Sequence, residues 1–275
     1  FSVSDCQAII KKAVVERLKS KYGISWFNES GPVHQIQFSI MNDNVTMLID
    51  TTGMGLHKRG YRLSQNGAPI KETLAASICA LAKLRHYHTL YDPMCGSGTL
   101  PIEAAMRMAN RAPGLTREFA IESWRDMPTQ TFAQIREEAK AAFEPDRIEG
   151  ISGSDIAPEA VELANRHLKQ AGLAGRVSFT VGDARECQID AERGAFLCNP
   201  PYGERLSDRK ECEALYHNMG LLLRRHPGFT LSAITSHPGF ERCFGRRADK
   251  KRRFYNGRLE CEFMTFGLPS QKKKK

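Results

Sequence analysis

The sequence contains no long apolar run, no closely paired cysteines and no internal repeat, and these absences exclude several classes of protein. No stretch approaches the roughly 20 apolar residues that a membrane-spanning helix needs. The eight cysteines form no Cys-x-x-Cys pair, and no histidine pair stands nearby at the spacing of zinc ligands, so we expect no metal site. Cysteines scattered in this way favour a reducing, intracellular setting, and we expect a cytoplasmic protein. No signal-peptide pattern opens the chain, although a start at Phe1 rather than Met leaves secretion open.

Positive charge is in modest excess and is unevenly distributed. The 40 Lys and Arg residues oppose 31 Asp and Glu, a net charge of +9. The terminal run Lys272–Lys275 supplies four of these charges, and without it 36 basic residues oppose 31 acidic ones, a net charge of +5. A second basic cluster consists of Arg242, Arg246, Arg247, Lys250, Lys251, Arg252, Arg253 and Arg258. Such a cluster suits phosphate contacts, and a solvated basic loop fits it equally well.

The first fifty residues predict a small α+β segment. Residues 1–22 carry apolar side chains at helical spacing, and Gly23 is placed to end this helix. Residues 34–40 alternate apolar with polar side chains, a turn follows, and residues 45–50 return as a second strand. Because one helix and one hairpin bury little apolar surface, this segment is either a truncated domain or a piece packed on the rest.

From about residue 70, short apolar strands alternate with helices. We expect helices at 71–84, 99–110, 130–143, 158–170 and 209–225, and strands at 89–92, 148–154, 176–181, 195–198, 229–235 and 259–266. This alternation predicts right-handed crossovers and a largely parallel sheet with helices on both faces. The fold class is therefore α/β, with an insertion at about 112–145.

The glycine loop Asp92-Pro93-Met94-Cys95-Gly96-Ser97-Gly98-Thr99 connects a predicted strand to a predicted helix. Glycines at this kind of turn let the backbone approach a ligand, and the helix N-terminus presents free N–H groups. The loop is not a dinucleotide fingerprint, because the third glycine is missing. It is not a phosphate loop either, because Gly-Lys-Ser/Thr is absent.

Two acidic residues follow the next two strands. Asp155, at the end of strand 148–154, could accept hydrogen bonds from both hydroxyls of a ribose. The alternative is that Asp155 caps helix 158–170, since Pro158 fits a helix start. Asp183, followed by Ala184 after strand 176–181, could accept from an adenine amino group.

The segment Asn199-Pro200-Pro201-Tyr202-Gly203 follows strand 195–198. Two successive prolines hold a rigid loop that has no N–H groups of its own to satisfy. The loop would fix the Asn199 amide, the Pro200 carbonyl and the Tyr202 ring in one place. An ordinary proline-containing turn is the alternative.

All four segments follow predicted parallel strands, so they should meet at the edge where open α/β sheets bind ligands. In the order glycine loop, acid, acid, Asn-Pro-Pro-Tyr, the set resembles the class I S-adenosylmethionine methyltransferases that act on exocyclic amino groups. The resemblance implies a Rossmann-like sheet with helices on both faces.

A closer resemblance extends over nearly the whole chain. Its segments are His57–Arg62, Ala68–Ala76, the glycine loop with Pro101–Glu103, Asn199–Gly203 and Asn256–Cys261. These are similar to segments of the THUMP-associated guanine-N2 RNA methyltransferases, bacterial 23S rRNA enzymes of the RlmL/YpsC type. The resemblance implies that residues 1–53 are the C-terminal part of a THUMP-like RNA-binding domain and that residues 54–275 are a methyltransferase domain.

The resemblance also implies a cofactor site for S-adenosylmethionine. Gly96 and Gly98 would pass beneath the cofactor, and Glu103 or Thr73 would help to hold its methionine end. Asp155 would bind the ribose and Asp183 the adenine. The full set is Thr73, Asp92, Pro93, Cys95, Gly96, Gly98, Thr99, Glu103, Asp155, Ile156, Asp183, Ala184 and Asn199.

The implied catalytic residues are Asn199, Pro200, Pro201 and Tyr202. Asn199 and the Pro200 carbonyl would accept the hydrogens of a weakly nucleophilic base amine, and Tyr202 would stack on that base. The basic cluster at 242–258 would hold flanking phosphates. The expected substrate is the 2-amino group of a guanine in RNA, with large-subunit (23S) rRNA as the expected target.

Other readings remain open. An adenine 6-amino methyltransferase acting on RNA or DNA could use the same loop, and tRNA could replace rRNA as the substrate. A non-catalytic RNA-binding assembly factor could retain the same fold. A covalent cytosine mechanism is disfavoured, because Cys95 and Cys198 follow neither proline nor threonine and suit small buried positions better.

Overall fold

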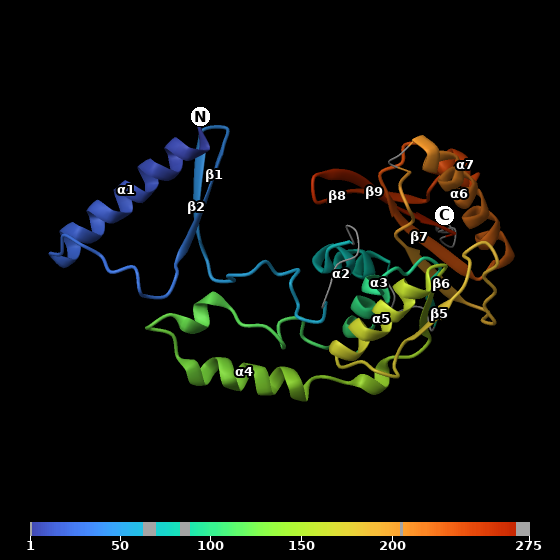
Figure 1. Cartoon of the computed structure of the whole chain (residues 1–275), viewed down its shortest axis with the longest axis horizontal. Helices are drawn as coiled ribbons and strands as arrows, with labels where there is room; N and C mark the ends of the chain where they lie inside the picture. The colour runs from blue at the N-terminus through green and yellow to red at the C-terminus, as the bar shows by residue number, and fades with distance from the viewer. Residues whose placement is uncertain (1, 63–69, 83–88, 204–205, 268–275) are drawn as a thin grey trace, which may run out of the picture. The chain divides into compact units, whose positions relative to one another are not determined.

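The computed structural model describes residues 2–62, 70–82, 89–203 and 206–267. The chain forms two compact units, which Figure 1 colours along the sequence. The first unit comprises residues 1–53 and 119–127, and the second comprises residues 54–118 and 128–275. Part of the insertion expected at about 112–145 therefore belongs to the first unit.

The first unit consists of helix α1 (Val3–Tyr22), strands β1 (Gln35–Met41) and β2 (Asn44–Asp50), and the short helix η2 (Ala120–Ser123). Gly23, at φ +66°, ends α1 as the sequence predicts. Asn42 and Asp43 both have positive φ, as a two-residue type I′ hairpin turn requires. No residue of α1 is buried. On its predicted apolar face Val14 and Leu18 are partly covered, whereas Ile9 and Tyr22 are exposed.

The inserted segment is joined to the hairpin side of the first unit. The Trp124 ring stacks on His34 at 4.4 Å, and its Nε1 donates to the carbonyl of Val33 at 3.3 Å. Backbone N–H groups of Ala120 and Ile121 bond to the residues that follow β2. These contacts between distant parts of the sequence could not be read from periodicity.

The second unit is built on a seven-stranded sheet in the order β5-β4-β3-β6-β7-β9-β8. The strands are β3 (Leu90–Asp92), β4 (Ile151–Asp155), β5 (Ser178–Val181), β6 (Gly194–Cys198), β7 (Phe229–Thr235), β8 (Lys250–Asn256) and β9 (Leu259–Phe266). The first five strands in that order are parallel, and β9 and β8 are antiparallel, which confirms a largely parallel sheet. The order reverses between β3 and β6, so the loops that leave these two strands lie beside the same crevice.

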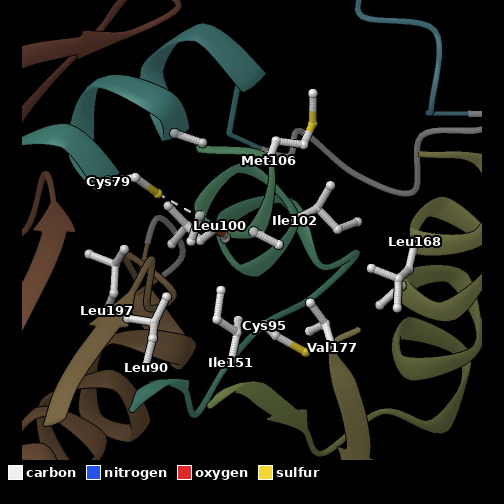
Figure 2. Packing of buried hydrophobic residues seen from close by; sticks show 14 of the residues in the cluster. Cys79, Leu90, Cys95, Leu100, Ile102, Met106, Ile151, Leu168, Val177 and Leu197 are labelled. Atoms are coloured by element: carbon white, nitrogen blue, oxygen red, sulfur yellow. Dashed lines mark hydrogen bonds between the residues drawn. The ribbon is translucent and has the colours of Figure 1, made fainter. Parts of the chain in front are cut away.

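Helices cover both faces of this sheet, as expected (Figure 1). The helices of the second unit are α2 (Glu72–Leu81), α3 (Thr99–Met108), α4 (Thr129–Ala141), η3 (Pro145–Arg147), α5 (Pro158–Gln170), α6 (Leu206–Arg225) and α7 (Phe240–Phe244). Of these, α2, α3 and α5 pack on one face of the sheet, and α6 and α7 pack on the other. Alternate residues of β6 point to opposite faces: Leu197 enters a cluster with α2, α3 and α5, whereas Phe196 enters a cluster with α6 and α7. Figure 2 shows the first cluster, where Leu90, Ile151 and Leu197 pack beneath Leu100 and Ile102.

Strand β8 was not expected from the sequence. Its residues Lys-Lys-Arg-Arg-Phe-Tyr-Asn lack an apolar alternation, and the sequence indicated only a basic stretch. The segment forms a strand because β9 supplies a complete ladder of partners from Asn256–Leu259 to Lys250–Thr265. At the edge of a sheet, charged side chains are tolerated and also discourage pairing with another chain.

Candidate functional site

The four predicted segments line one cavity of about 910 Å³ at the carboxyl ends of the parallel strands. Asp208, Glu211 and Cys212 of α6 contribute to a further wall of this cavity. The predicted residues that line it are Pro93, Gly96, Asp155, Ile156, Asp183, Ala184, Asn199 and Pro201. The structure thus brings together segments that are up to about a hundred residues apart in the chain.

Asp155 ties two of these segments together. Its Oδ2 accepts from the backbone N–H of Gly96 at 2.8 Å, and its Oδ1 accepts from the N–H of Ala157 at 3.0 Å. The N-cap of α5 is Ala157, which makes no side-chain cap, so Asp155 is not the helix cap that the alternative reading proposed. The carboxylate instead positions the glycine loop and lines the cavity, and each of its oxygens can accept a further hydrogen bond.

The two glycines of the loop meet different surroundings. At Gly98 (φ +80°) an added Cβ would lie 2.9 Å from the Ala164 Cβ and from the Phe179 Cζ. At Gly96 (φ +51°) an added Cβ would meet nothing within 4 Å. Gly98 is therefore required by the close approach of the glycine loop to α5 and β5, whereas Gly96 borders the open cavity and lets the backbone itself form its wall.

Asp183 and Ile156 contribute different chemistry to the wall of the cavity. The Asp183 carboxylate is held by the Arg185 guanidinium, with Nε at 2.9 Å from both oxygens, and this hydrogen bonding lowers the pKa of Asp183. Ile156 is 64% exposed and lines the cavity. Together they present one charged edge and one apolar face.

The Asn199–Tyr202 loop is fixed at two points by tyrosine hydroxyls. Tyr202 Oη donates to Asn199 Oδ1 at 2.7 Å, and Tyr216 Oη, from α6, donates to the Pro201 carbonyl at 2.5 Å. Tyr216 is fully buried, and the partly buried Tyr202 ring packs against the first core cluster. Burial raises the pKa of Tyr202 well above its usual value, so this hydroxyl stays protonated and acts as a donor.

Asp92, Cys95 and Thr99 do not line the cavity but lie buried behind the glycine loop. Asp92 Oδ1 accepts from the Met94 N–H at 3.1 Å, and burial raises the pKa of this carboxyl. Burial also raises the pKa of the Cys95 and Cys198 thiols, so neither is a thiolate nucleophile.

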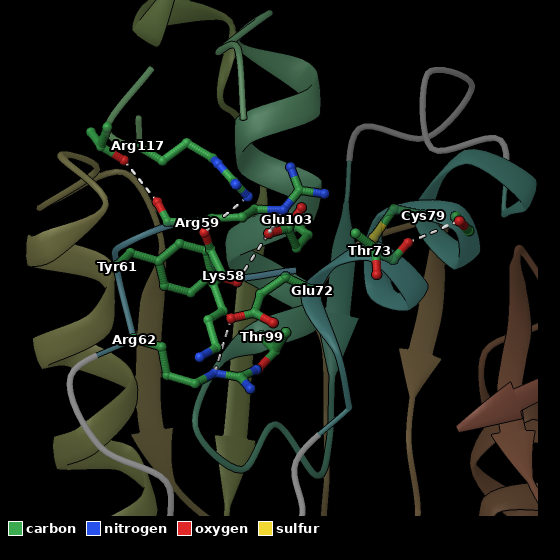
Figure 3. A network of polar contacts seen from close by, with 12 residues as sticks. Lys58, Arg59, Tyr61, Arg62, Glu72, Thr73, Cys79, Thr99, Glu103 and Arg117 are labelled. Atoms are coloured by element: carbon green, nitrogen blue, oxygen red, sulfur yellow. Dashed lines mark hydrogen bonds and ion pairs between the residues drawn. The ribbon is translucent and has the colours of Figure 1, made fainter. Parts of the chain in front are cut away.

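Glu103 and Thr73 are not part of this cavity. Glu103 is 2% exposed, lies 3.3 Å from the Arg59 Nε and accepts from Tyr61 Oη at 3.0 Å (Figure 3). Its side chain projects one helical turn beyond the loop, into a network between α3 and residues 59–62. The expectation that Glu103 or Thr73 holds the methionine end of a cofactor therefore finds no support in the geometry.

Three positioning residues were missed by sequence reasoning. Arg62 lies 3.5 Å from Glu72 and donates to Thr99 Oγ1 at 2.7 Å, which links α2 to the start of α3 (Figure 3). His167 Nδ1 lies 3.1 Å from the Ser97 carbonyl, and Tyr216 holds the Pro201 carbonyl. A buried polar residue on a predicted apolar helix face, such as His167 on α5, is the signal that could have indicated them.

Within the described ranges, no group of three or more His, Cys, Asp or Glu side chains could hold a metal ion. Among those same residues, no helix is long and apolar enough to cross a membrane.

A parallel sheet with a glycine loop, an acid and an Asn-Pro-Pro-Tyr loop around one cavity defines a Rossmann-like, S-adenosylmethionine-dependent methyltransferase. The chain belongs to the UPF0020 family, whose RMKL-like methyltransferase domain matches residues 59–265. A THUMP domain matches residues 1–50.

Relatives with assigned names agree with this family. The putative RNA methyltransferase YpsC of Bacillus subtilis is 38% identical over 267 residues, which cover 96% of this chain and 69% of that protein. The ribosomal RNA large subunit methyltransferase K/L of Legionella pneumophila is 34% identical over 274 residues, which cover 97% of this chain and 39% of that protein. The chain thus spans well under half the length of the K/L proteins.

Two solved structures have the same fold over nearly the whole chain. One is described as a predicted N6-adenine-specific DNA methylase from Listeria monocytogenes (TM-score 0.90, 42% identity, 98% of this chain and 70% of that one). The other is SMU.472, a putative methyltransferase complexed with SAH (TM-score 0.86, 38% identity, 94% of this chain and 69% of that one).

Proposed function

We propose that this chain transfers a methyl group from S-adenosylmethionine to the exocyclic 2-amino group of a guanine in RNA, with large-subunit rRNA in the cytoplasm as the target. The observation that carries the proposal is that Asn199 opens on the same cavity as Gly96 and Asp155. The names of the K/L and YpsC relatives support RNA as the substrate class. We further propose that residues 1–53 are the C-terminal part of a THUMP domain and that residues 54–275 form the methyltransferase domain.

The cavity fits the cofactor. Gly96 leaves open space where any side chain would intrude, and Asp155 faces the cavity with acceptor capacity for two ribose hydroxyls. Ile156 offers an apolar surface for one face of the adenine, and Asp183 and Ala184 lie at its edge. When bound, S-adenosylmethionine supplies the electrophilic methyl group of its sulfonium.

Asn199 is the residue that makes the base amine reactive. The lone pair of that amine is delocalised into the ring, so the nitrogen must be held out of the plane to attack. Asn199 Oδ1 accepts from Tyr202 through one lone pair and keeps a second for an amine hydrogen, while the Pro200 carbonyl accepts the other. Positioning of this kind supplies about 7–11 kcal/mol in the best cases.

No tuned general base is needed. The nitrogen forms its bond to carbon as the carbon–sulfur bond breaks, and the amine proton is lost to solvent afterwards. This agrees with the protonated state of Tyr202 and of the nearby thiols. The target base must be extruded or unpaired to reach Asn199, and stacking on the exposed part of the Tyr202 ring would contribute roughly 1–3 kcal/mol.

Labelled cofactor and RNA that lacks the modification test the proposal directly. The full chain is incubated with both, and the RNA is digested to nucleosides. The label should appear in N2-methylguanosine. Label in N6-methyladenosine would favour the adenine alternative, which the description of the Listeria structure also names. Saturable cofactor binding without any transfer would favour the assembly-factor alternative.

A further inference from the structure

The basic cluster is divided between the two faces of strand β8. Successive side chains of a strand point to opposite faces, so Arg252, Phe254 and Asn256 share one face while Lys251 and Arg253 share the other. The two faces differ in whether carboxylates of the protein neutralise their positive charges. This difference separates basic residues that form ion pairs within the protein from basic residues that can bind a ligand.

On one face the positive charges are neutralised within the protein. Lys251 bonds to Glu241 of α7 and lies 3.7 Å from Glu262, and Arg253 Nε lies 3.1 Å from Glu260. The hydrogen bond to Glu241 raises the pKa of Lys251. Lys251 thus links the edge strand to α7, and both residues have a carboxylate partner within the protein.

On the other face, and in the turn of the hairpin, positive charges are uncompensated. Arg252 and the hairpin-turn residue Arg258 are both exposed, and neither makes an ion pair or side-chain hydrogen bond within the part of the chain that the structure describes. The charge of a guanidinium that no carboxylate neutralises is available for phosphate. The positive charge that the hairpin can offer to a ligand therefore lies at particular residues, such as Arg252 and Arg258, and is not spread evenly over its surface.

The uncompensated face leads to the catalytic loop. Glu262 pairs with Thr235, the last residue of β7, so residues 259–261 and their partners on β8 extend past the end of the parallel strands. There Cys261 Sγ lies 3.9 Å from Tyr202 Oη, and a side-chain hydrogen bond from Asn256 acts on the same hydroxyl. Because Phe254 packs on the core cluster that Tyr202 contacts, Arg252 lies on the Tyr202 side of the hairpin.

We propose that Arg252 and Arg258 bind phosphates of the RNA strand that carries the target base, and that Lys251 and Arg253 do not. The β8–β9 hairpin would then guide an unpaired strand past Tyr202, so that one base can enter the slot beside Asn199. This inference rests on the proposed function, since it takes RNA as the substrate.

Two double variants of equal charge test the division. Arg252→Ala/Arg258→Ala and Lys251→Ala/Arg253→Ala each remove two positive charges from the same hairpin. The binding of a fluorescein-labelled, unstructured 20-nucleotide RNA is measured by anisotropy over a series of salt concentrations. For the first variant we expect about tenfold weaker binding and a salt-dependence slope reduced by about 1.4, the value for two lost contacts to a single strand. For the second we expect less than a twofold change.

Equal weakening by both variants would overturn the inference, because it would show a general effect of net charge. Unchanged binding by the first variant would overturn it as well. Circular dichroism and cofactor titration confirm that each variant is folded, so that loss of structure cannot imitate loss of contacts. Failure of the proposed function is distinguishable, since it would appear as absent methyl transfer by the unmodified chain whatever the two variants do.

Discussion

Gly96 and Gly98 lie in the same loop and both have positive φ, yet an added side chain would meet different surroundings at the two positions. Alanine at either position costs roughly 1–3 kcal/mol in backbone strain. At Gly98 the new methyl group would also press on Ala164 and Phe179, an overpacking cost of roughly 1–3 kcal/mol. At Gly96 it would enter only open space at the cavity wall.

We therefore expect Gly98→Ala to lower the melting temperature clearly more than Gly96→Ala. Gly96→Ala should instead weaken S-adenosylmethionine binding by tenfold or more, on the order of 1.4 kcal/mol. Thermal melts and calorimetric titrations of the pair measure both effects. Equal melting temperatures, or full cofactor affinity in Gly96→Ala, would refute the division of roles.

Tyr216 holds the Asn199–Tyr202 loop, which we propose to be the reactive loop. Tyr216→Phe removes the hydroxyl that holds the Pro201 carbonyl while leaving the buried ring in place. A net loss of about 1 kcal/mol in positioning predicts a fall in kcat of about three- to tenfold with cofactor affinity unchanged. Tyr255→Phe, which removes an exposed hydroxyl bonded to Glu260, is the matched control and should leave kcat unchanged. A parallel loss of cofactor affinity would instead mark Tyr216 as merely structural.

At the scale of elements, a buried network joins residues 59–62 to α3 and makes stability depend on pH. Burial raises the pKa of Glu103 from 4.5 to about 7, in spite of the neighbouring Arg59. Between these two values the folded chain keeps a proton that the unfolded chain releases. The contribution of this group to the free energy of unfolding therefore falls as pH rises through that window.

Glu103→Gln imitates the protonated form at every pH. We expect this variant to melt close to the unmodified chain at pH 5 and at a higher temperature than the unmodified chain at pH 8. Calorimetric scans at the two values check this. A variant that is less stable only at pH 8 would show that the ionised Glu103–Arg59 pair stabilises the fold.

The sequence predicts elements well where a pattern is local. The bounds of α5 and β7 agree with the structure to the residue, because Pro158 starts the helix and turn residues at Gly228 and at 236–239 bound the short strand. Strand β8 could not be predicted, since its own residues show no strand pattern and its pairing partner β9 follows it in the chain. Asp155 was ambiguous for the same reason, because its partner Gly96 is 59 residues away.

The candidate site could likewise be predicted only where a simple rule applies. Loops that follow parallel strands meet at one edge, and this rule places Gly96, Asp155 and Asn199 around one cavity. The rule does not predict the surroundings of side chains one helical turn from the loop. Glu103 pairs with Arg59 and does not line the cavity. The family resemblance includes residues 57–62, but it does not show that Arg62 links α2 to the start of α3.

At the scale of the whole molecule, the two units differ in burial. Helix α1 has no buried residue, and apolar side chains of the β1–β2 hairpin such as Met47 and Ile49 are more than half exposed. In the second unit, every residue of β6 and β7 is buried. Elements with few buried contacts open at a low cost in free energy.

Hydrogen exchange followed by mass spectrometry should therefore find two levels of protection. We expect amides of α1, β1 and β2 to exchange about tenfold or more faster than those of β6 and β7. The cofactor should slow exchange further around residues 92–99 and leave the first unit unaffected. Uniform protection along the chain would contradict this difference between the units.

The proposed function requires that separate residues at one edge of the sheet bind the cofactor and the substrate base. Calorimetric titration with S-adenosylmethionine, combined with single-turnover methyl transfer, tests this requirement most directly. Asp155→Ala removes the carboxylate that faces the cavity and holds Gly96, and it should abolish measurable binding. Asn199→Ala should bind the cofactor within about twofold of the unmodified chain yet transfer methyl groups at least about a hundredfold more slowly. Equal loss of binding in both variants, or transfer by Asn199→Ala at the unmodified rate, would contradict this arrangement of the site.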